Sequence, residues 1–357
     1  MLDSKEIEDK ILELRTELKT DRLDMSFGEI MSLYEKEDLF ISPEYQRAYR
    51  WNENQKSRFI ESILLGVPIP PIFVAEDNDG KWELVDGLQR ISTILSFFGI
   101  LKNDLKNNNY FKLIETSLTK KILEDISIDE LSVKLQNTIK RSVCRVEILR
   151  WDSEFDMRYE LFNRLNTGSS PLKPQEVRNC VLLGKFNNLL KEIASMENFI
   201  NIIESDEEKN EVYIREMYFE ELVLRYFSVI FGDLNVEKNI PEYLTNFMKN
   251  VNKEEININL ELEKEKLINI INFINDNFDK SIFRGGNNRF SENLYETVLY
   301  FAYKYFDKYK NIPQEFLSKI DILKDDDEYK KASGFQTHQK SRLKRKFERA
   351  EEIFNGI

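Results

Sequence analysis

The spacing of apolar residues changes character near Val181, and this change limits the folds open to the chain. Before this point, short apolar runs bounded by turn residues predict strands, at residues 39–42, 72–75, 82–85 and 142–149. After it, apolar residues recur every three or four positions, which is typical of amphipathic helices. We therefore expect an α+β fold in two domains. Residues 1–180 would hold a small sheet with a polar, partly helical insert at about 99–141, and residues 181–357 would be mainly helical.

Helical patterns also predict where individual helices lie. An N-terminal helix is expected from Ile7 to Leu18, ending where Asp21–Asp24 interrupt the pattern. The second half is expected to contain helices at residues 186–193, 199–203, 218–231, 243–251, 260–278, 294–305, 316–323 and 341–354. The acidic stretches Glu204–Glu211 and Asp325–Glu328 are interpreted as solvated turns between them.

Composition narrows the class of protein. With 41% hydrophobic residues in 357, the chain can bury a sizeable core. No apolar run approaches the roughly 20 residues needed to span a membrane, and two cysteines give no disulfide framework. We expect a cytoplasmic protein with no membrane partner. The net charge of -12 argues against coating nucleic acid over the whole surface, although a local basic patch is still allowed.

The chain contains one histidine, His338, close to its end and among basic residues. Zinc sites built on two or three histidines, ββα-metal (HNH-type) nuclease centres and most histidine-based triads need histidines in the core of the chain. Any chemistry must therefore be done by carboxylates, Arg, Lys, hydroxyl groups and amides.

The stretch Val85–Ile94 combines an apolar strand, an acid, a glycine and an amphipathic helix. Asp86, Gln89 and Arg90 crowd the predicted strand-to-helix joint, where backbone N–H groups and the helix dipole favour anions. The alternative is ordinary capping, with Asp86 as N-cap and Gln89 completing a capping box. Capping does not explain Arg90, because a cation is unfavourable at a helix N-terminus. We interpret the joint as a phosphate-handling site.

Two further stretches contain polar residues that are not needed to form the predicted local structure. Arginines interleave with aromatics in Pro43–Trp51, a composition that suits phosphate and base contacts, or a surface loop whose aromatics merely pack. In Phe162–Leu172, Gly168 and Pro171 suffice to end a helix. The polar residues left unassigned are Asn163, Arg164, Asn166 and Thr167.

The second half has two cationic segments. The basic run near the end of the chain would contact nucleic acid or a partner protein, or form a solvated face, through Lys340, Arg342, Lys344, Arg345 and Lys346. The Gly/Asn-rich loop Arg284–Asn293 begins a helix, and its arginines could face an anion or simply accompany helix capping.

Four segments in order resemble a known family: Tyr45–Trp51, Glu61–Pro71, Val85–Arg90 and Phe162–Asn179. Their succession resembles the N-terminal domain family of GmrSD-type restriction endonucleases, and the family's D-G-Q-Q-R motif corresponds to Asp86–Arg90. The resemblance extends from about Leu23 to Ile353.

This resemblance implies a ParB/sulfiredoxin-like α+β core followed by a helical domain. In the family, the motif is associated with NTP binding and hydrolysis that gates nucleic-acid cleavage in anti-phage defence. Carried over, Asp86, Gly87, Gln89 and Arg90 would form the phosphate site, with Mg²⁺ or another divalent cation on Asp86. The further nucleotide contacts would be Gln46, Arg47, Arg50, Thr93, Asn163, Asn166 and Thr167.

The sequence departs from the family in two ways. Leu88 replaces the first glutamine of the motif, and the HNH nuclease domain found in many relatives is missing. The prediction is an NTP-binding and NTP-hydrolysing regulatory component of a restriction-like system. It would act with phage DNA, a separate nuclease or a second copy of itself. The alternatives are a nucleotide- or DNA-binding module without hydrolysis, and a metal-dependent DNA nickase.

Overall fold

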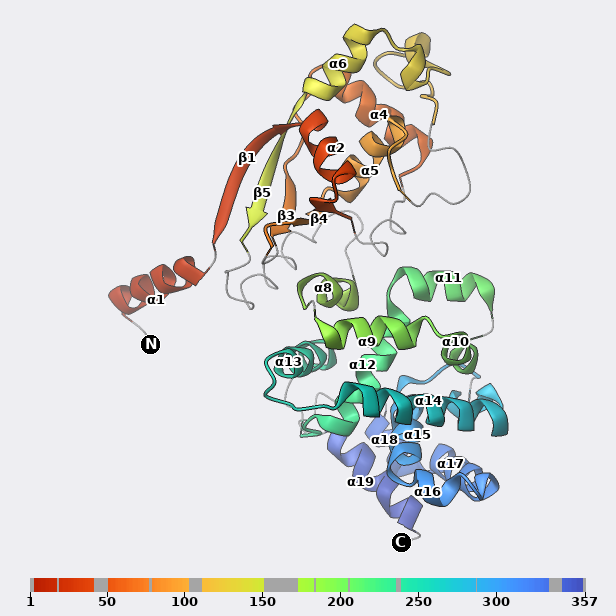
Figure 1. Ribbon diagram of the computed structural model, residues 1–357. Coiled ribbons are helices and arrows are strands. Elements are labelled where there is room, and N and C mark those ends of the chain that lie inside the picture. Colours follow the sequence, from red (N-terminus) through yellow and green to blue (C-terminus); the bar gives the residue numbers. More distant parts are fainter. Residues whose placement is uncertain are drawn as a thin grey trace. The chain divides into compact units, whose positions relative to one another are not determined.

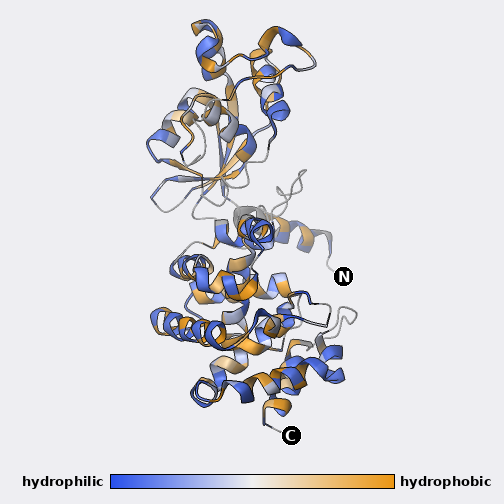
Figure 2. Cartoon of the chain, turned by 90° about the vertical axis from the view of Figure 1, so that its right-hand side faces the viewer, coloured by the Kyte–Doolittle hydropathy of each residue, from blue (hydrophilic) through white to orange (hydrophobic). Residues whose placement is uncertain are grey.

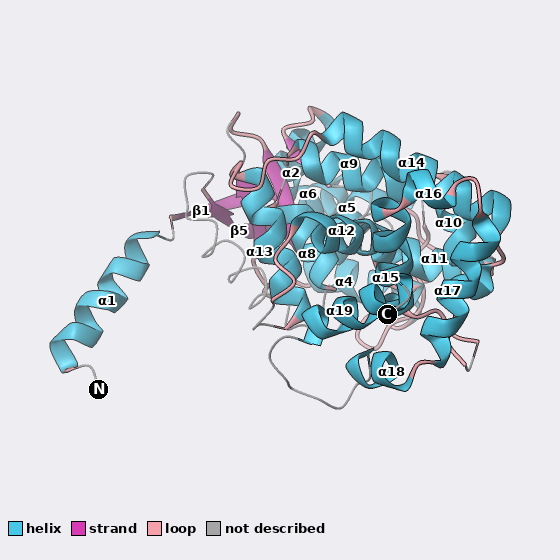
Figure 3. Cartoon of the chain, turned by 90° about the horizontal axis from the view of Figure 1, so that it is seen from below, coloured by secondary structure: helices cyan, strands magenta, loops and turns pink. Residues whose placement is uncertain are grey.

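The computed structural model divides into two compact units, Met1–Pro171 and Leu172–Ile357. Figure 1 labels their elements, and Figure 3 shows the strands of the first unit among otherwise helical structure. The residues described are 3–17, 19–41, 51–76, 79–102, 111–150, 173–182, 184–204, 206–235, 239–286, 288–333 and 342–355. A sheet confined to the first unit and a helical second unit confirm the predicted α+β class.

The first unit is organised around a mixed five-stranded sheet with the order β1-β5-β3-β4-β2. Its strands are β1 (Thr20–Ser26), β2 (Leu39–Phe40), β3 (Ile72–Glu76), β4 (Trp82–Asp86) and β5 (Val143–Leu149). β3 and β4 form the predicted antiparallel hairpin, while β3 pairs with β5 in parallel. This order places the end of β4, and the joint that follows it, next to the start of β3.

Strand β1 was not predicted, and the expected break at Asp21–Asp24 lies inside it. It forms the sheet edge, so most of its residues are exposed and show no apolar alternation. Two cross-strand ion pairs with β5 join Arg22 to Glu147 and Arg145 to Asp24, at 2.8 and 2.9 Å. These residues form a strand because they pair with β5. The sequence of the segment alone does not predict that pairing.

Most helices of the first unit lie beside this sheet, whereas the N-terminal one extends away from it (Figure 1). The elements are α1 (Ser4–Glu17), α2 (Phe27–Glu35), α4 (Glu53–Leu64), α5 (Leu88–Phe97), the 3-10 turns η1 (Lys121–Leu123) and η2 (Ile128–Glu130), and α6 (Val133–Arg141). Two of them begin with reciprocal capping boxes, Ser26 with Glu29 for α2 and Asn52 with Gln55 for α4. The apolar faces of α4 and α5 join the core, where Ile60, Ile91 and Leu95 are almost fully buried.

The second unit consists of helices. They are α8 (Pro174–Val181), α9 (Lys185–Ala194), α10 (Glu197–Ile203), α11 (Glu207–Arg215), α12 (Tyr218–Phe231), α13 (Ile240–Asn252), α14 (Leu260–Asn277), η3 (Lys280–Phe283), α15 (Glu292–Lys304), α16 (Phe306–Tyr309), α17 (Pro313–Asp325), α18 (Asp327–Ser333) and α19 (Arg342–Asn355). Figure 2 shows that most of these helices carry both hydrophilic and hydrophobic residues, which is the pattern that predicted them.

Two acidic segments expected as turns contribute to helices instead. Asp206 caps α11 by accepting hydrogen bonds from the N–H groups of Glu208 and Lys209, and α18 begins at Asp327. Acidic residues stabilise the positive end of a helix, so these stretches mark helix starts. Among the described residues, no helix is both long enough and apolar enough to cross a membrane.

Candidate functional site

The joint between β4 and α5 depends on Gly87. Its φ angle of +98° lies in the left-handed region, which glycine adopts without strain. A Cβ atom at this position would lie only 2.5 Å from Cγ2 of Ile72, so a side chain is excluded as well. The chain can therefore turn sharply from strand to helix only with glycine here, and this turn brings Asp86 and Arg90 together.

The capping interpretation of this joint is wrong. Gly87, and not Asp86, is the N-cap of α5, and no side chain caps the helix from that position. The Oε1 atom of Gln89 instead accepts a hydrogen bond from the backbone N–H of Trp51 at 3.0 Å. Gln89 thereby connects the start of α5 to the segment preceding α4, a contact between residues far apart in sequence.

Arg90 holds three backbone or side-chain oxygens at once. Its Nη1 atom donates to the carbonyl oxygens of Pro70 and Pro71 at 2.7 and 3.1 Å, and Nη2 donates to Oδ2 of Asp86 at 2.8 Å. The side chain of Arg90 is 14% exposed and that of Asp86 is 47% exposed. Arg90 therefore clamps the proline-rich connector onto the start of α5, which accounts for the residue that capping could not explain.

The joint offers one carboxylate with spare coordination capacity. Arg90 bonds to Oδ2 of Asp86, and no described residue bonds to Oδ1. Across the described residues, no group of three or more His, Cys, Asp or Glu side chains is arranged to hold a metal ion. A cation at this joint would have one protein ligand, Oδ1 of Asp86, and would complete its shell with water and phosphate oxygens, as Mg²⁺ can.

The other predicted nucleotide contacts are mostly outside the described residues: Gln46, Arg47, Arg50, Asn163, Asn166 and Thr167. Thr93 is the one of these predicted contacts that lies among the described residues. It is fully buried, and its hydroxyl donates to the carbonyl oxygen of Gln89 at 2.6 Å. Thr93 therefore supports the first turn of α5 from inside.

The predicted basic patch on α19 is smaller than its sequence indicated. Lys344 is exposed and lies 3.8 Å from Glu348, and Arg345 is exposed as well. Lys346, in contrast, is 1% exposed and pairs with Glu296 of α15, so it belongs to the core and not to a surface patch. Lys340 and the side chain of Arg342 are outside the described residues.

Lys346 belongs to a buried ion network that sequence reasoning missed. Arg225 of α12 contacts Glu296 at 2.9 Å and also pairs with Glu221 and Glu292. Burial alone would raise the pKa of Glu296, but Lys346 and Arg225 lower it below its ordinary value. The sequence does contain a pattern that indicates burial of Lys346. This residue shares a helix face with three apolar residues, Leu343, Phe347 and Ala350.

The network continues into α8 through a fully buried arginine. Arg178 donates to Glu221 of α12 and to the side-chain oxygen of Gln175, both at 2.8 Å. Its Nη1 atom also donates to the carbonyl oxygen of Pro241 at 3.2 Å. Every charge in this chain of contacts has an opposite charge beside it, so the network stabilises helix packing and leaves nothing to bind a ligand.

Comparison with known proteins supports the family suggested by the sequence motifs. Residues 27–183 match the family model described as GmrSD restriction endonuclease, N-terminal domain. This part of the chain is a GmrSD-type N-terminal domain. The match includes the joint at Asp86–Arg90, α8 and the residues between β5 and α8. No curated protein and no solved structure matches the chain.

The family match indicates a functional context and the part of the chain to which it applies. A GmrSD-type domain places the chain in the context of restriction systems. The resemblance was expected to continue to about Ile353, whereas the match ends at residue 183. The helices from α9 onward are therefore described by their own structure alone.

Proposed function

We propose that the GmrSD-type domain binds a nucleoside triphosphate with Mg²⁺ at the start of α5 and hydrolyses it, as a regulatory component of an anti-phage restriction system. The observation that carries the proposal is the uncapped start of α5, beside Asp86. A helix begins with N–H groups that lack intrahelical partners and with a partial positive charge, and both favour phosphate. A glycine N-cap leaves these groups without a competing side chain of its own.

Asp86 and Arg90 would have different roles in binding and hydrolysis. Asp86 would hold the cation through Oδ1 while keeping its bond to Arg90. The cation, when bound, supplies charge neutralisation on the phosphate oxygens. Nη1 of Arg90 donates to Pro70 and Pro71 and Nη2 donates once to Asp86, which leaves the Nε hydrogen and the second Nη2 hydrogen to stabilise charge on the transferred group.

The test measures phosphate release from ATP, GTP, CTP and UTP by the full chain, with Mg²⁺ and with or without phage DNA. We expect Asp86→Asn to abolish Mg²⁺-dependent release while keeping a hydrogen-bond acceptor for Arg90. The matched control is Asp129→Asn, at an exposed aspartate in η2 of the same unit. Release at background level from wild type under every condition, or equal release from wild type and Asp86→Asn, overturns the proposal.

Binding without hydrolysis is the second candidate, and the contacts of the joint support it. The side-chain oxygen of Gln89 accepts the Trp51 N–H, so it already has a structural contact. A pure binding module would be stabilised by an NTP, since a ligand that binds the native state raises the apparent melting temperature, yet would release no phosphate. Under this candidate, nucleic-acid cleavage is the task of a separate nuclease recruited by the nucleotide-bound form.

A further inference from the structure

A polar cleft in the second unit is separate from the joint at Asp86. It lies where α10, α11 and α14 meet η3 and has a volume of about 690 Å³, which is within the usual range for small-molecule sites. We call it the α10–α14 cleft and define it by Asn201, Lys209, Asn275, Phe278, Lys280 and Arg284. Arg284 belongs to the Gly/Asn-rich loop for which the sequence left open contact with an anion or simple helix capping.

The acidic side chains of the cleft are already engaged. Glu204 lies 3.5 Å from the Lys209 amine and 3.6 Å from the Arg284 guanidinium. Asp279 accepts the backbone N–H of Ser281 at 2.8 Å, and this hydrogen bond lowers the pKa of its carboxyl group. Glu204 therefore lies between two cations, whereas Asp279 keeps Oδ2 unbonded by any described residue.

The other polar side chains that line the cleft are cations and primary amides. Among the described residues, the side chains of Asn201, Asn275 and Lys280 make no hydrogen bond or ion pair. Arg284 contacts only carbonyl oxygens at 3.2 and 3.3 Å besides its loose pair with Glu204, and its side chain is 15% exposed. Cations favour an anion, and primary amides supply both donors and acceptors for a polar ring edge.

An aromatic wall completes the lining. The ring of Phe278 packs against Phe273 and Phe316, with centroids 5.3 and 5.9 Å apart, so its position is fixed by neighbours. Phe278 is half-buried. A fixed ring at the edge of a cleft can stack on a flat heterocycle.

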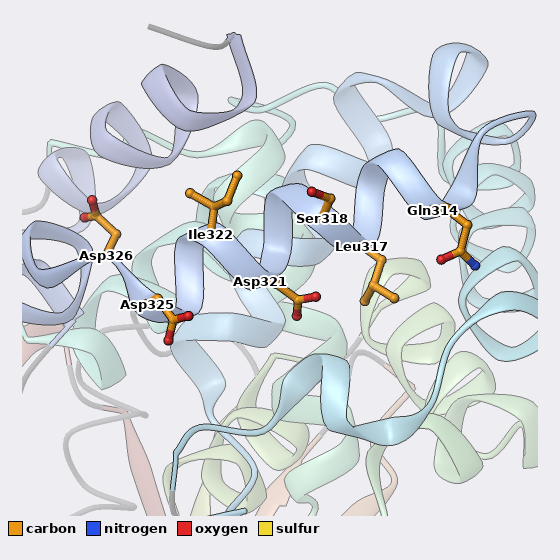
Figure 4. A pocket seen from close by; sticks show the side chains of 7 residues that line it. All are labelled: Gln314, Leu317, Ser318, Asp321, Ile322, Asp325 and Asp326. Atoms are coloured by element: carbon orange, nitrogen blue, oxygen red, sulfur yellow. The ribbon is translucent and has the colours of Figure 1, made fainter.

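From these features we propose that the α10–α14 cleft binds a free mononucleotide. The phosphate would pair with Lys280 and Arg284, and the base would lie against Phe278 with its edge near the asparagine amides. The hollow along α17 in Figure 4 does not offer this combination, because the charged side chains that line it are Asp321, Asp325 and Asp326 of a single helix region. Acidic groups repel phosphate.

The test is calorimetric titration of the full chain with AMP in EDTA, which removes the divalent cation that the proposed NTP site needs. We expect one binding event per chain. Lys280→Gln should weaken it about tenfold or more, because hydrogen bonds to charged groups are the stronger ones. Asn275→Asp should weaken it by a similar factor, since it places a negative charge beside the phosphate or base.

Two controls separate this site from the joint. Lys253→Gln, at an exposed lysine after α13 that makes no side-chain contact with the described residues, should leave AMP binding unchanged. Asp86→Asn should also leave it unchanged, whatever its effect on triphosphate hydrolysis. Adenosine and inorganic phosphate should each bind more weakly than AMP, because each lacks half of the ligand.

Several outcomes would overturn the proposal. They are the absence of AMP binding at millimolar concentration, binding that survives both Lys280→Gln and Asn275→Asp, and binding lost in Asp86→Asn. Equal affinity for inorganic phosphate and AMP would also contradict it, because the cleft would then recognise an anion and not a nucleotide. Melting temperatures of the variants establish that each is folded.

Discussion

The ion pair at the start of α5 and the ion network between α8, α12, α15 and α19 place similar groups in opposite surroundings. Asp86 is about half exposed and keeps one carboxylate oxygen unbonded by any described residue. Glu296 is fully enclosed, and both of its oxygens contact cations, Arg225 and Lys346. An exposed pair can exchange partners at small cost, whereas a buried pair cannot. This difference identifies the first as a candidate site and the second as a framework.

The largest expected effect comes from breaking the buried network. Lys346→Met should lower the free energy of unfolding by about 3 kcal/mol or more, because it leaves Glu296 short of one of its two cations in a buried environment. Urea denaturation of the full chain measures this loss. Lys344→Gln, two residues away on the exposed face of α19, is the matched control and should change stability by less than about 0.5 kcal/mol.

A second substitution tests whether charge is the cause. In the Lys346→Met background, Glu296→Gln should recover part of the loss, since a neutral amide no longer needs the ammonium group. If Lys346→Met alone were as stable as wild type, the network would not be what holds these helices together.

An intermediate effect is expected at the glycine of the joint. Gly87→Ala should destabilise the protein by about 2–3 kcal/mol, from left-handed backbone strain together with the contact to Ile72. Gly80→Ala is a matched control, because its φ of +79° is similar while no atom lies within 4 Å of the added Cβ. It should cost only the backbone strain, about 1 kcal/mol. Equal losses in both variants would mean that the close approach to Ile72 has no structural importance.

The smallest effect is expected for the exposed pair. Asp86→Asn should change the free energy of unfolding by less than about 1 kcal/mol, because the pair with Arg90 is partly solvated and the amide oxygen still accepts a hydrogen bond. Thermal and urea unfolding measure this. A loss as large as that of Lys346→Met would make Asp86 a framework residue and would weaken its assignment to a binding site.

The sequence predicted those elements whose signal is local. The apolar spacing of Tyr218–Phe231 predicts α12 with its observed bounds, and the alternation of Cys144, Val146 and Ile148 with polar residues predicts β5. A helix that buries one stripe, or a strand that buries one face, records that burial in its own residues.

The missed features depend on partners that are distant in sequence. The edge strand β1 is defined by its pairing with β5, and the role of Arg90 depends on carbonyl oxygens about 20 residues earlier. No local pattern contains either contact. Lys346 is an intermediate case. The apolar residues on its helix face indicate burial, but the basic residues next to it in sequence suggested an exposed position.

The position of Lys346 also bears on how the second unit is made. Glu296 precedes Lys346 by 50 residues, so α12 and α15 leave the ribosome before the cation that completes their network is synthesised. Until α19 has emerged and docked, Glu296 has Arg225 but not Lys346, and the apolar face of α19 is missing from the core. The helical unit can therefore finish folding only after synthesis of its last described helix, and an interrupted chain would expose an incomplete core to the cell's quality control.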